Sequence, residues 1–289
     1  MIGLTQLNVW IDVIFSTLYV VIVVALSGHF LGNILTGRAK RRFVGWEWPA
    51  HEGGPIPVLP KFLHFQHVAG MIALGVSGMY IRFPFFNGGR GFMQWVHYIA
   101  MIVVIINLIV RLWYAFGSRR RDYREFAITK RDITTAPKVI LYYIFVKPSK
   151  PHLGKYNVMQ KGTYTIFVPL LIAQALTGLM LWRLQMPFVG VSIQQLVAGL
   201  IGGTGVWWIR TAHYVINWLF IVLTTIHVYL SVTEDFPAFL DFFGLGFLDR
   251  PHAGHDDAGH DDHGHDAHDG HEGVPSGLDA AAPLVGDSV

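Results

Sequence analysis

Histidines placed in long apolar stretches are the residues of this sequence best suited to chemistry. The chain has 15 histidines and no cysteine, which excludes thiol nucleophiles, disulfides, cysteine-bound zinc and iron–sulfur clusters. Six histidines lie in or at the border of apolar stretches: His29, His64, His67, His97, His213 and His227. An ionisable side chain is costly in such surroundings, so each is a functional candidate. For any single one, the alternative is a hydrogen-bonded packing residue.

The spacing of four of these histidines suggests two pairs at two depths. Fourteen residues separate His213 from His227 on one stretch, which is about 3.9 helical turns, so they share a face about 21 Å apart along the axis. His97 begins a stretch at the depth of His213. His64 begins a stretch of opposite direction at the depth of His227. Haem iron accepts two axial imidazoles from facing helices, and the pattern therefore predicts two b-type haems.

Other residues compete for this site or could support it. His67 lies one helical turn from His64, and could be the ligand instead or contact a quinone. Three arginines border the apolar stretches and could bind the anionic haem propionates: Arg82, Arg111 and Arg210. Snorkelling of these side chains to the membrane interface is the alternative. His29 has no obvious partner, so we expect it to pack in the core.

The stretches that carry these residues are long enough to be transmembrane helices. The chain has 289 residues, of which 52% are hydrophobic and only 14% charged. Crossing the hydrocarbon takes about 20 helical residues, and we expect spans at residues 10–31, 64–83, 95–116, 163–182 and 207–232. Their hydrophobicity is continuous rather than alternating, which excludes a β-barrel. The predicted fold class is all-α, an integral membrane helical bundle with five transmembrane helices.

The distribution of charge predicts the orientation of these spans. Basic residues concentrate in the loops after the first and third spans, with eleven between Arg119 and Lys161. The positive-inside rule makes these loops cytoplasmic. The N-terminus is then outside and the C-terminus cytoplasmic, in the inner membrane of a bacterial or archaeal cell. Because the basic residues lie between apolar spans, they do not indicate nucleic-acid binding.

Residues 251–289 differ from the rest and are expected to form a disordered tail. They contain nine acidic residues and no Lys or Arg. Seven histidines lie among the Asp and Gly residues of this tail: His252, His255, His260, His263, His265, His268 and His271. Such tracts bind metal ions weakly, so a second hypothesis is a metal-handling membrane protein or transporter. A transporter would cluster its ligands at one depth, and incidental metal affinity of an acidic tail is the preferred interpretation.

Short motifs accompany the histidines of the spans. They are Lys61 before His64-Phe65, Ser77-Gly78, the stretch Arg111-Leu-Trp-Tyr-Ala-Phe116 after His97, and His227-Val-Tyr before Glu234-Asp235. With these motifs, residues 61–245 resemble the cytochrome b subunit of membrane-bound NiFe-hydrogenases and the related formate dehydrogenase gamma subunit, both bacterial cytochrome b561-like proteins. The stretch after His97 and the Glu234-Asp235 ending favour the hydrogenase subunit. Gly154 to Asn157 and Gln160-Lys161 are more similar to the formate dehydrogenase subunit.

The resemblance implies a four-helix di-haem core in which His64, rather than His67, is a ligand. Residues 1–35 then form an extra N-terminal transmembrane helix. The resemblance also implies a non-catalytic electron-transfer subunit, which takes electrons from partner catalytic and iron–sulfur subunits and passes them to quinone. A stand-alone cytochrome b561 is a further alternative. Glu234 and Asp235 could supply protons to quinone or form a solvated helix end.

Overall fold

The computed structural model describes residues 4–48, 57–118, 123, 127–148 and 158–249. Five helices are long and apolar enough to cross a membrane, as predicted. They are α1 (Leu4–Leu35), α2 (Val58–Arg82), α3 (Arg90–Gly117), α5 (Val158–Met180) and α6 (Ile193–Glu234). The shorter elements are η1 (Lys40–Val44), α4 (Lys130–Tyr143), α7 (Phe236–Phe242) and η3 (Gly246–Leu248). The described residues thus form an all-α protein without β-strands.

Local sequence signals fix where several helices begin or bend. Ser192 caps α6 in a reciprocal capping box with Gln195, which satisfies two backbone N–H groups at the helix start. Thr129 caps α4 in the same way. Within α6, Gly202 has φ 72° and ψ 173°, a conformation that glycine adopts easily. This kink separates the first turns of α6 from the span that carries its histidines.

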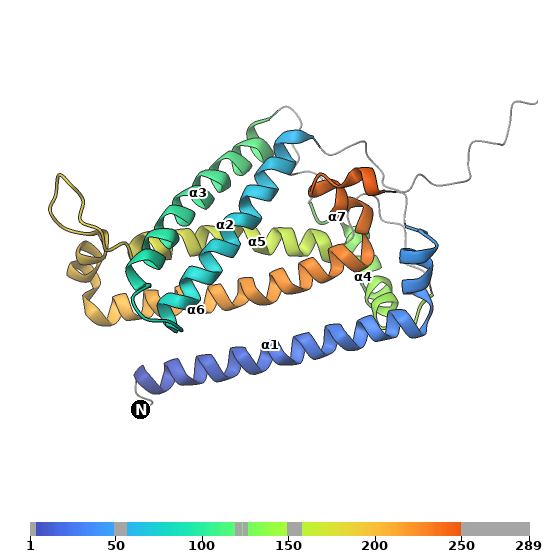
Figure 1. Ribbon diagram of the computed structural model, residues 1–289, viewed down its shortest axis with the longest axis horizontal. Helices are drawn as coiled ribbons and strands as arrows, with labels where there is room; N and C mark the ends of the chain where they lie inside the picture. Colours follow the sequence, from blue (N-terminus) through green and yellow to red (C-terminus); the bar gives the residue numbers. More distant parts are fainter. Residues whose placement is uncertain (1–3, 49–56, 119–122, 124–126, 149–157, 250–289) are drawn as a thin grey trace, which may run out of the picture. The chain divides into compact units, whose positions relative to one another are not determined.

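Four of the long helices form two antiparallel hairpins, α2 with α3 and α5 with α6 (Figure 1). Between α2 and α3, the buried Asn107 donates to Leu63 O at 2.8 Å and to Gln66 Oε1 at 2.9 Å. Gly70 gives the same two helices a close approach, because a Cβ there would lie 2.5 Å from a methyl of Val104. The two hairpins contact each other where α3 packs against α5 and where His97 of α3 lies beside His213 of α6.

The additional helix, α1, runs parallel to α6 and outside the two hairpins (Figure 1). Near its start, Asp12 accepts from Tyr214 of α6 at 2.6 Å and from Arg82 of α2 at 2.9 Å. Near its end, His29 bonds Tyr229 of α6 at 2.5 Å. Most of its apolar side chains are exposed, as expected for a helix that faces lipid. We call the level of His213 the outer level and the level of His227 the inner level. These names follow the orientation that the distribution of charge predicts.

Candidate haem site

The outer level brings together His97 of α3 and His213 of α6. Their ring centroids lie 6.4 Å apart and their ring planes are inclined by 69°. A metal–imidazole bond is about 2 Å and a ring nitrogen lies roughly 1.1 Å from the centroid, so two imidazoles on opposite sides of one iron have centroids about 6 Å apart. The observed separation therefore fits a single iron held between the two rings.

Each of these imidazoles is fixed by a hydroxyl from the neighbouring helix of its own hairpin. Ser77 Oγ of α2 lies 3.0 Å from His97 Nδ1, and Thr177 Oγ1 of α5 lies 2.9 Å from His213 Nδ1. Both hydroxyls also lie within hydrogen-bond distance of carbonyls one turn earlier, Ser77 at 2.6 Å from Ala73 O and Thr177 at 2.8 Å from Ala173 O. A hydroxyl has one proton to donate. When that proton goes to the carbonyl, the hydroxyl oxygen accepts from Nδ1–H, and this tautomer leaves the Nε2 lone pair for a metal.

Two glycines leave room beside these rings. A Cβ at Gly78 would lie 3.5 Å from His97 Cε1. A Cβ at Gly178 would lie 3.3 Å from His213 Cε1 and 3.4 Å from Met101 Sδ. Each glycine directly follows the hydroxyl residue of its helix. Larger side chains at either position would fill the space that a flat ligand between the hairpins needs.

An amide lies beside the ring nitrogen that would carry the iron. Gln174 Nε2 is 3.3 Å from His213 Nε2. The other amide atom, Gln174 Oε1, is buried and has no hydrogen-bond partner among the described residues. A buried polar atom without a partner is costly in a membrane interior. Together with the paired imidazoles, it fits a site built around a further bound group.

The inner level contains His64, His67 and His227. His64 lies within electrostatic range of His227 and of His67. Its ring is 4.7 Å from that of Phe242 in α7, and the ring of His227 is 6.3 Å from that of Phe167 in α5. Both rings are partly buried. The level thus gathers histidines from α2 and α6 among aromatic rings, and the pairing of His64 with His227 on one haem stays a prediction.

The three candidate arginines have different surroundings. Arg111 of α3 lies within electrostatic range of His64 and His67, beside the inner histidines. Arg82 is instead paired with Asp12 of α1 at 2.9 Å, and its guanidinium lies 4.7 Å from the centre of the Tyr214 ring. Arg210 is exposed. Of the three, Arg111 is therefore the one that interacts electrostatically with the inner histidines.

A buried ion pair occupies the inner ends of α1 and α6. Arg42 of η1 donates to Glu234 Oε1 at 2.7 Å and to Thr233 O at 2.6 Å. It also donates to the hydroxyl of Tyr142 in α4. Burial, reinforced by the Glu234 carboxylate, raises the pKa of Tyr142, so this hydroxyl stays protonated at neutral pH. Glu234 is only 6% exposed, so the alternative of a solvated helix end is wrong for this residue, which forms a buried ion pair instead.

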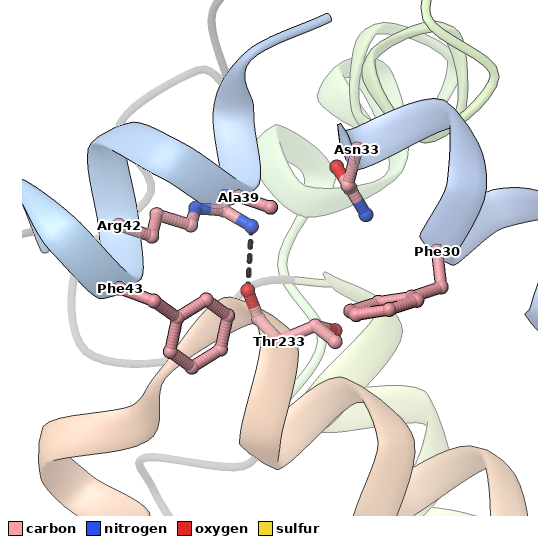
Figure 2. Close-up of a pocket in the computed structure, with 6 residues that line it drawn as sticks. All are labelled: Phe30, Asn33, Ala39, Arg42, Phe43 and Thr233. Carbon is pink, nitrogen blue, oxygen red and sulfur yellow. Dashed lines mark hydrogen bonds between the residues drawn. The ribbon is translucent and has the colours of Figure 1, made fainter. Parts of the chain in front are cut away.

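A small pocket adjoins this ion pair, away from the histidine pairs. Figure 2 shows its lining residues, Phe30, Asn33, Ala39, Arg42, Phe43 and Thr233. The dashed line marks the hydrogen bond from Arg42 to the Thr233 carbonyl. Next to the pocket, His29 is hydrogen-bonded to Tyr229 and lies 3.2 Å from the Asn33 amide. His29 therefore belongs to the packing between α1 and α6, as expected.

Sequence reasoning misses three residues beside the outer histidines, which are Ser77, Thr177 and Gln174. A signal for the two hydroxyl residues is present in the sequence, since Ile72-Ala73 precedes Ser77-Gly78 at the spacing at which Ile172-Ala173 precedes Thr177-Gly178. The equivalent placement of the two motifs against His97 and His213 emerges only in the folded chain.

The described part of the chain contains no ligand cluster that supports the metal-handling hypothesis. No group of three or more His, Cys, Asp or Glu side chains comes together there in a way that could hold a metal ion. The seven tail histidines, His252 to His271, lie outside the described residues, as do Gly154 to Asn157. Metal binding by that tail therefore stays a prediction from the sequence.

Known proteins are similar to this chain over more than half of its length. Two relatives, from Rhizobium leguminosarum bv. viciae and Azotobacter vinelandii, are each described as a probable Ni/Fe-hydrogenase B-type cytochrome subunit. Each is 23% identical, over 192 and 197 residues, and each alignment covers 61% of this chain and 78% of the relative. The family described as prokaryotic cytochrome b561 matches residues 56–243, which include all of α2 to α7. With more than half of its length matched, the chain belongs to the prokaryotic cytochrome b561 family, multi-pass membrane proteins that contain b-type haem and transfer electrons.

Proposed function

We propose that this chain is the membrane cytochrome b subunit of a NiFe-hydrogenase complex, which passes electrons from that complex to quinone through two b-type haems. The observation that carries the proposal is the outer pair, in which His97 and His213 lie 6.4 Å apart. Both rings are anchored at Nδ1 by hydroxyls. Two imidazoles anchored at Nδ1, with no group of acidic ligands beside them in the described part of the chain, suit an iron porphyrin better than a hydrated metal ion.

The residues of the chain have separate tasks in this proposal. A bound haem b supplies one-electron chemistry at its iron. His97 and His213 would hold the outer group, and His64 and His227 the inner one. Ser77 and Thr177 keep the proton of each outer imidazole on Nδ1, away from the iron. The apolar helices around both levels exclude water, and Arg111 provides a positive charge for an anionic propionate at the inner level.

The absence of cysteine and the two relatives support a hydrogenase as the electron donor. With no cysteine in the chain, iron–sulfur centres must come from partner subunits. Both relatives are described as probable Ni/Fe-hydrogenase cytochrome subunits. The partners are therefore proposed to be the iron–sulfur and catalytic subunits of such a complex, with quinone as the acceptor.

Haem stoichiometry in single-histidine variants tests the ligand assignment. The purified wild-type chain should bind two haems and give a b-type band in reduced-minus-oxidised spectra. His97→Ala and His213→Ala should each lose the outer haem, and His64→Ala the inner one. His67→Ala should retain both haems, which separates it from His64.

His29→Ala is a matched control, because it removes a histidine of the same bundle whose side chain is hydrogen-bonded to Tyr229 and Asn33, outside the two histidine levels. It should keep both haems. Absence of the b-type band in the wild-type chain, or full haem in His213→Ala, would contradict the proposal. Co-purification with a hydrogenase, and reduction of the band by hydrogen in that complex, would test the proposed donor separately.

A further inference from the structure

Each of the two outer histidines is hydrogen-bonded to a hydroxyl residue of the other helix in its hairpin. In the first, a serine of α2 faces the histidine of α3. In the second, a threonine of α5 faces the histidine of α6. Each hydroxyl residue is followed by the glycine that makes room beside the ring. The repeated arrangement makes both hydroxyls act on Nδ1 of a ring whose Nε2 faces the site.

The position of each hydroxyl restricts what it can do. Ser77 is fully buried, and its Oγ lies 2.6 Å from Ala73 O and 3.3 Å from Leu74 O. Thr177 Oγ1 lies 2.8 Å from Ala173 O and 3.1 Å from Gln174 O. The hydroxyl proton is thus directed to a helix carbonyl in both cases. The oxygen is left as an acceptor for imidazole N–H.

We propose that Ser77 and Thr177 are positioning residues that set the redox potential of the outer haem and the orientation of its two axial imidazoles. This proposal rests on the proposed function. An acceptor at Nδ1 makes an imidazole a stronger donor to iron. A stronger donor stabilises ferric over ferrous iron, so both hydroxyls lower the midpoint potential. They also fix each ring about its Cβ–Cγ bond, which maintains the 69° angle between the ring planes.

The test is a potentiometric titration of the purified full-length chain with both haems bound. Ser77→Ala and Thr177→Val should each keep two haems and raise the midpoint potential of the haem that is lost in His213→Ala. At a fixed potential near the midpoint, loss of one such bond should change the ratio of oxidised to reduced outer haem by about two- to fivefold. The inner haem should titrate as in the wild type.

Electron paramagnetic resonance gives a second measurement on the same variants. Nearly perpendicular axial imidazoles produce a low-spin ferric signal of large g anisotropy. Release of one ring from its hydroxyl should change that anisotropy for the outer haem alone. Ser16→Ala and Thr165→Val are matched controls, because these hydroxyls bond carbonyls of their own helices, Asp12 O and Lys161 O. Neither control should change the potential or the signal.

Variants that keep the hydroxyl separate its effect from packing. Thr177→Ser and Ser77→Thr should retain the wild-type potential. If Thr177→Ser shifts the potential as much as Thr177→Val, the methyl group rather than the hydroxyl is responsible and the proposal is overturned. If Thr177→Val loses the outer haem altogether, retention in Thr177→Ser at the wild-type potential supports the proposal, and loss in both variants overturns it.

The outcomes distinguish this proposal from the proposed function. A wild-type chain without an outer haem, or with an outer haem that survives His213→Ala, refutes the function itself. Two bound haems with potentials that do not move in Ser77→Ala and Thr177→Val refute only the role of the hydroxyls.

Discussion

The buried ion pair between Arg42 and Glu234 should contribute strongly to the attachment of α1. The two side chains are only 11% and 5% exposed, with a closest contact of 2.7 Å. Glu234→Gln removes the charge but preserves the shape, so Arg42 would remain a buried cation with neutral partners. Breaking a buried pair by removal of one partner costs about 3–5 kcal/mol. Because an amide oxygen still accepts one hydrogen bond, we expect a loss near the lower limit, about 3 kcal/mol.

A double-mutant cycle measures this contribution. The free energy of unfolding of the purified protein would be measured by SDS titration in mixed micelles for Glu234→Leu, Arg42→Met and the double variant. Each single variant leaves one buried charge, whereas the double variant leaves none and should cost much less than the sum of the two. Hydrogen exchange in η1 would show whether the loss is local to the end of α1.

The half-exposed pair between Lys61 and Asp241 provides a matched control. Its atoms are 2.5 Å apart, but its side chains are 26% and 33% exposed. Solvent-exposed pairs contribute roughly 0–1 kcal/mol, so Asp241→Asn should have little effect. If Glu234→Gln costs no more than Asp241→Asn, or if the cycle is additive, the reasoning that burial makes the inner pair important is refuted.

Three other contacts should respond measurably to substitution. Hydrogen bonds from Thr129, assisted by Lys161, lower the pKa of Asp132 to about 2. The ionised carboxylate therefore stabilises the folded protein above the pKa of Asp in the unfolded chain, which is about 4. This contribution to the free energy of unfolding is lost as the pH falls towards 2. Asp132→Asn should therefore lower the melting temperature at pH 7, and the difference from wild type should shrink below pH 4. Gly178→Leu should displace the outer haem but keep the inner one, as counted by haem content. Asn107→Leu should lower the free energy of unfolding by about 1–3 kcal/mol, since it removes the buried amide that donates to Leu63 O and to Gln66 Oε1 between α2 and α3.

Controls for these three variants come from the same chain. Gly75→Leu on α2 places its side chain in open space and should keep both haems, so a haem loss there equal to that of Gly178→Leu would contradict the steric argument. A difference between Asp132→Asn and wild type that stays constant from pH 7 to pH 2 would exclude the carboxylate as the source of its stability. An unchanged unfolding free energy for Asn107→Leu would show that the α2–α3 contact tolerates the lost bonds.

The sequence alone determined the number of spans and their helical character. A chain in lipid must satisfy its backbone internally, so apolar length and composition are sufficient to predict five helices, and all five are present. The spacing of His213 and His227 placed them on one face of α6, because helical periodicity is a local property. The same reasoning placed His97 at the level of His213, and the structure puts their rings 6.4 Å apart. Their role as haem ligands stays a prediction.

The tertiary structure alone decided which side chains from different helices meet. Helix register and rotation depend on how side chains of two surfaces fit together, and neither is encoded in the hydrophobic pattern of one helix. Only the folded chain places Ser77 and Thr177 against the outer histidines, directs Arg82 to Asp12 rather than to the site, and buries Glu234 against Arg42. Periodicity thus located the histidines, and packing between helices selected their partners.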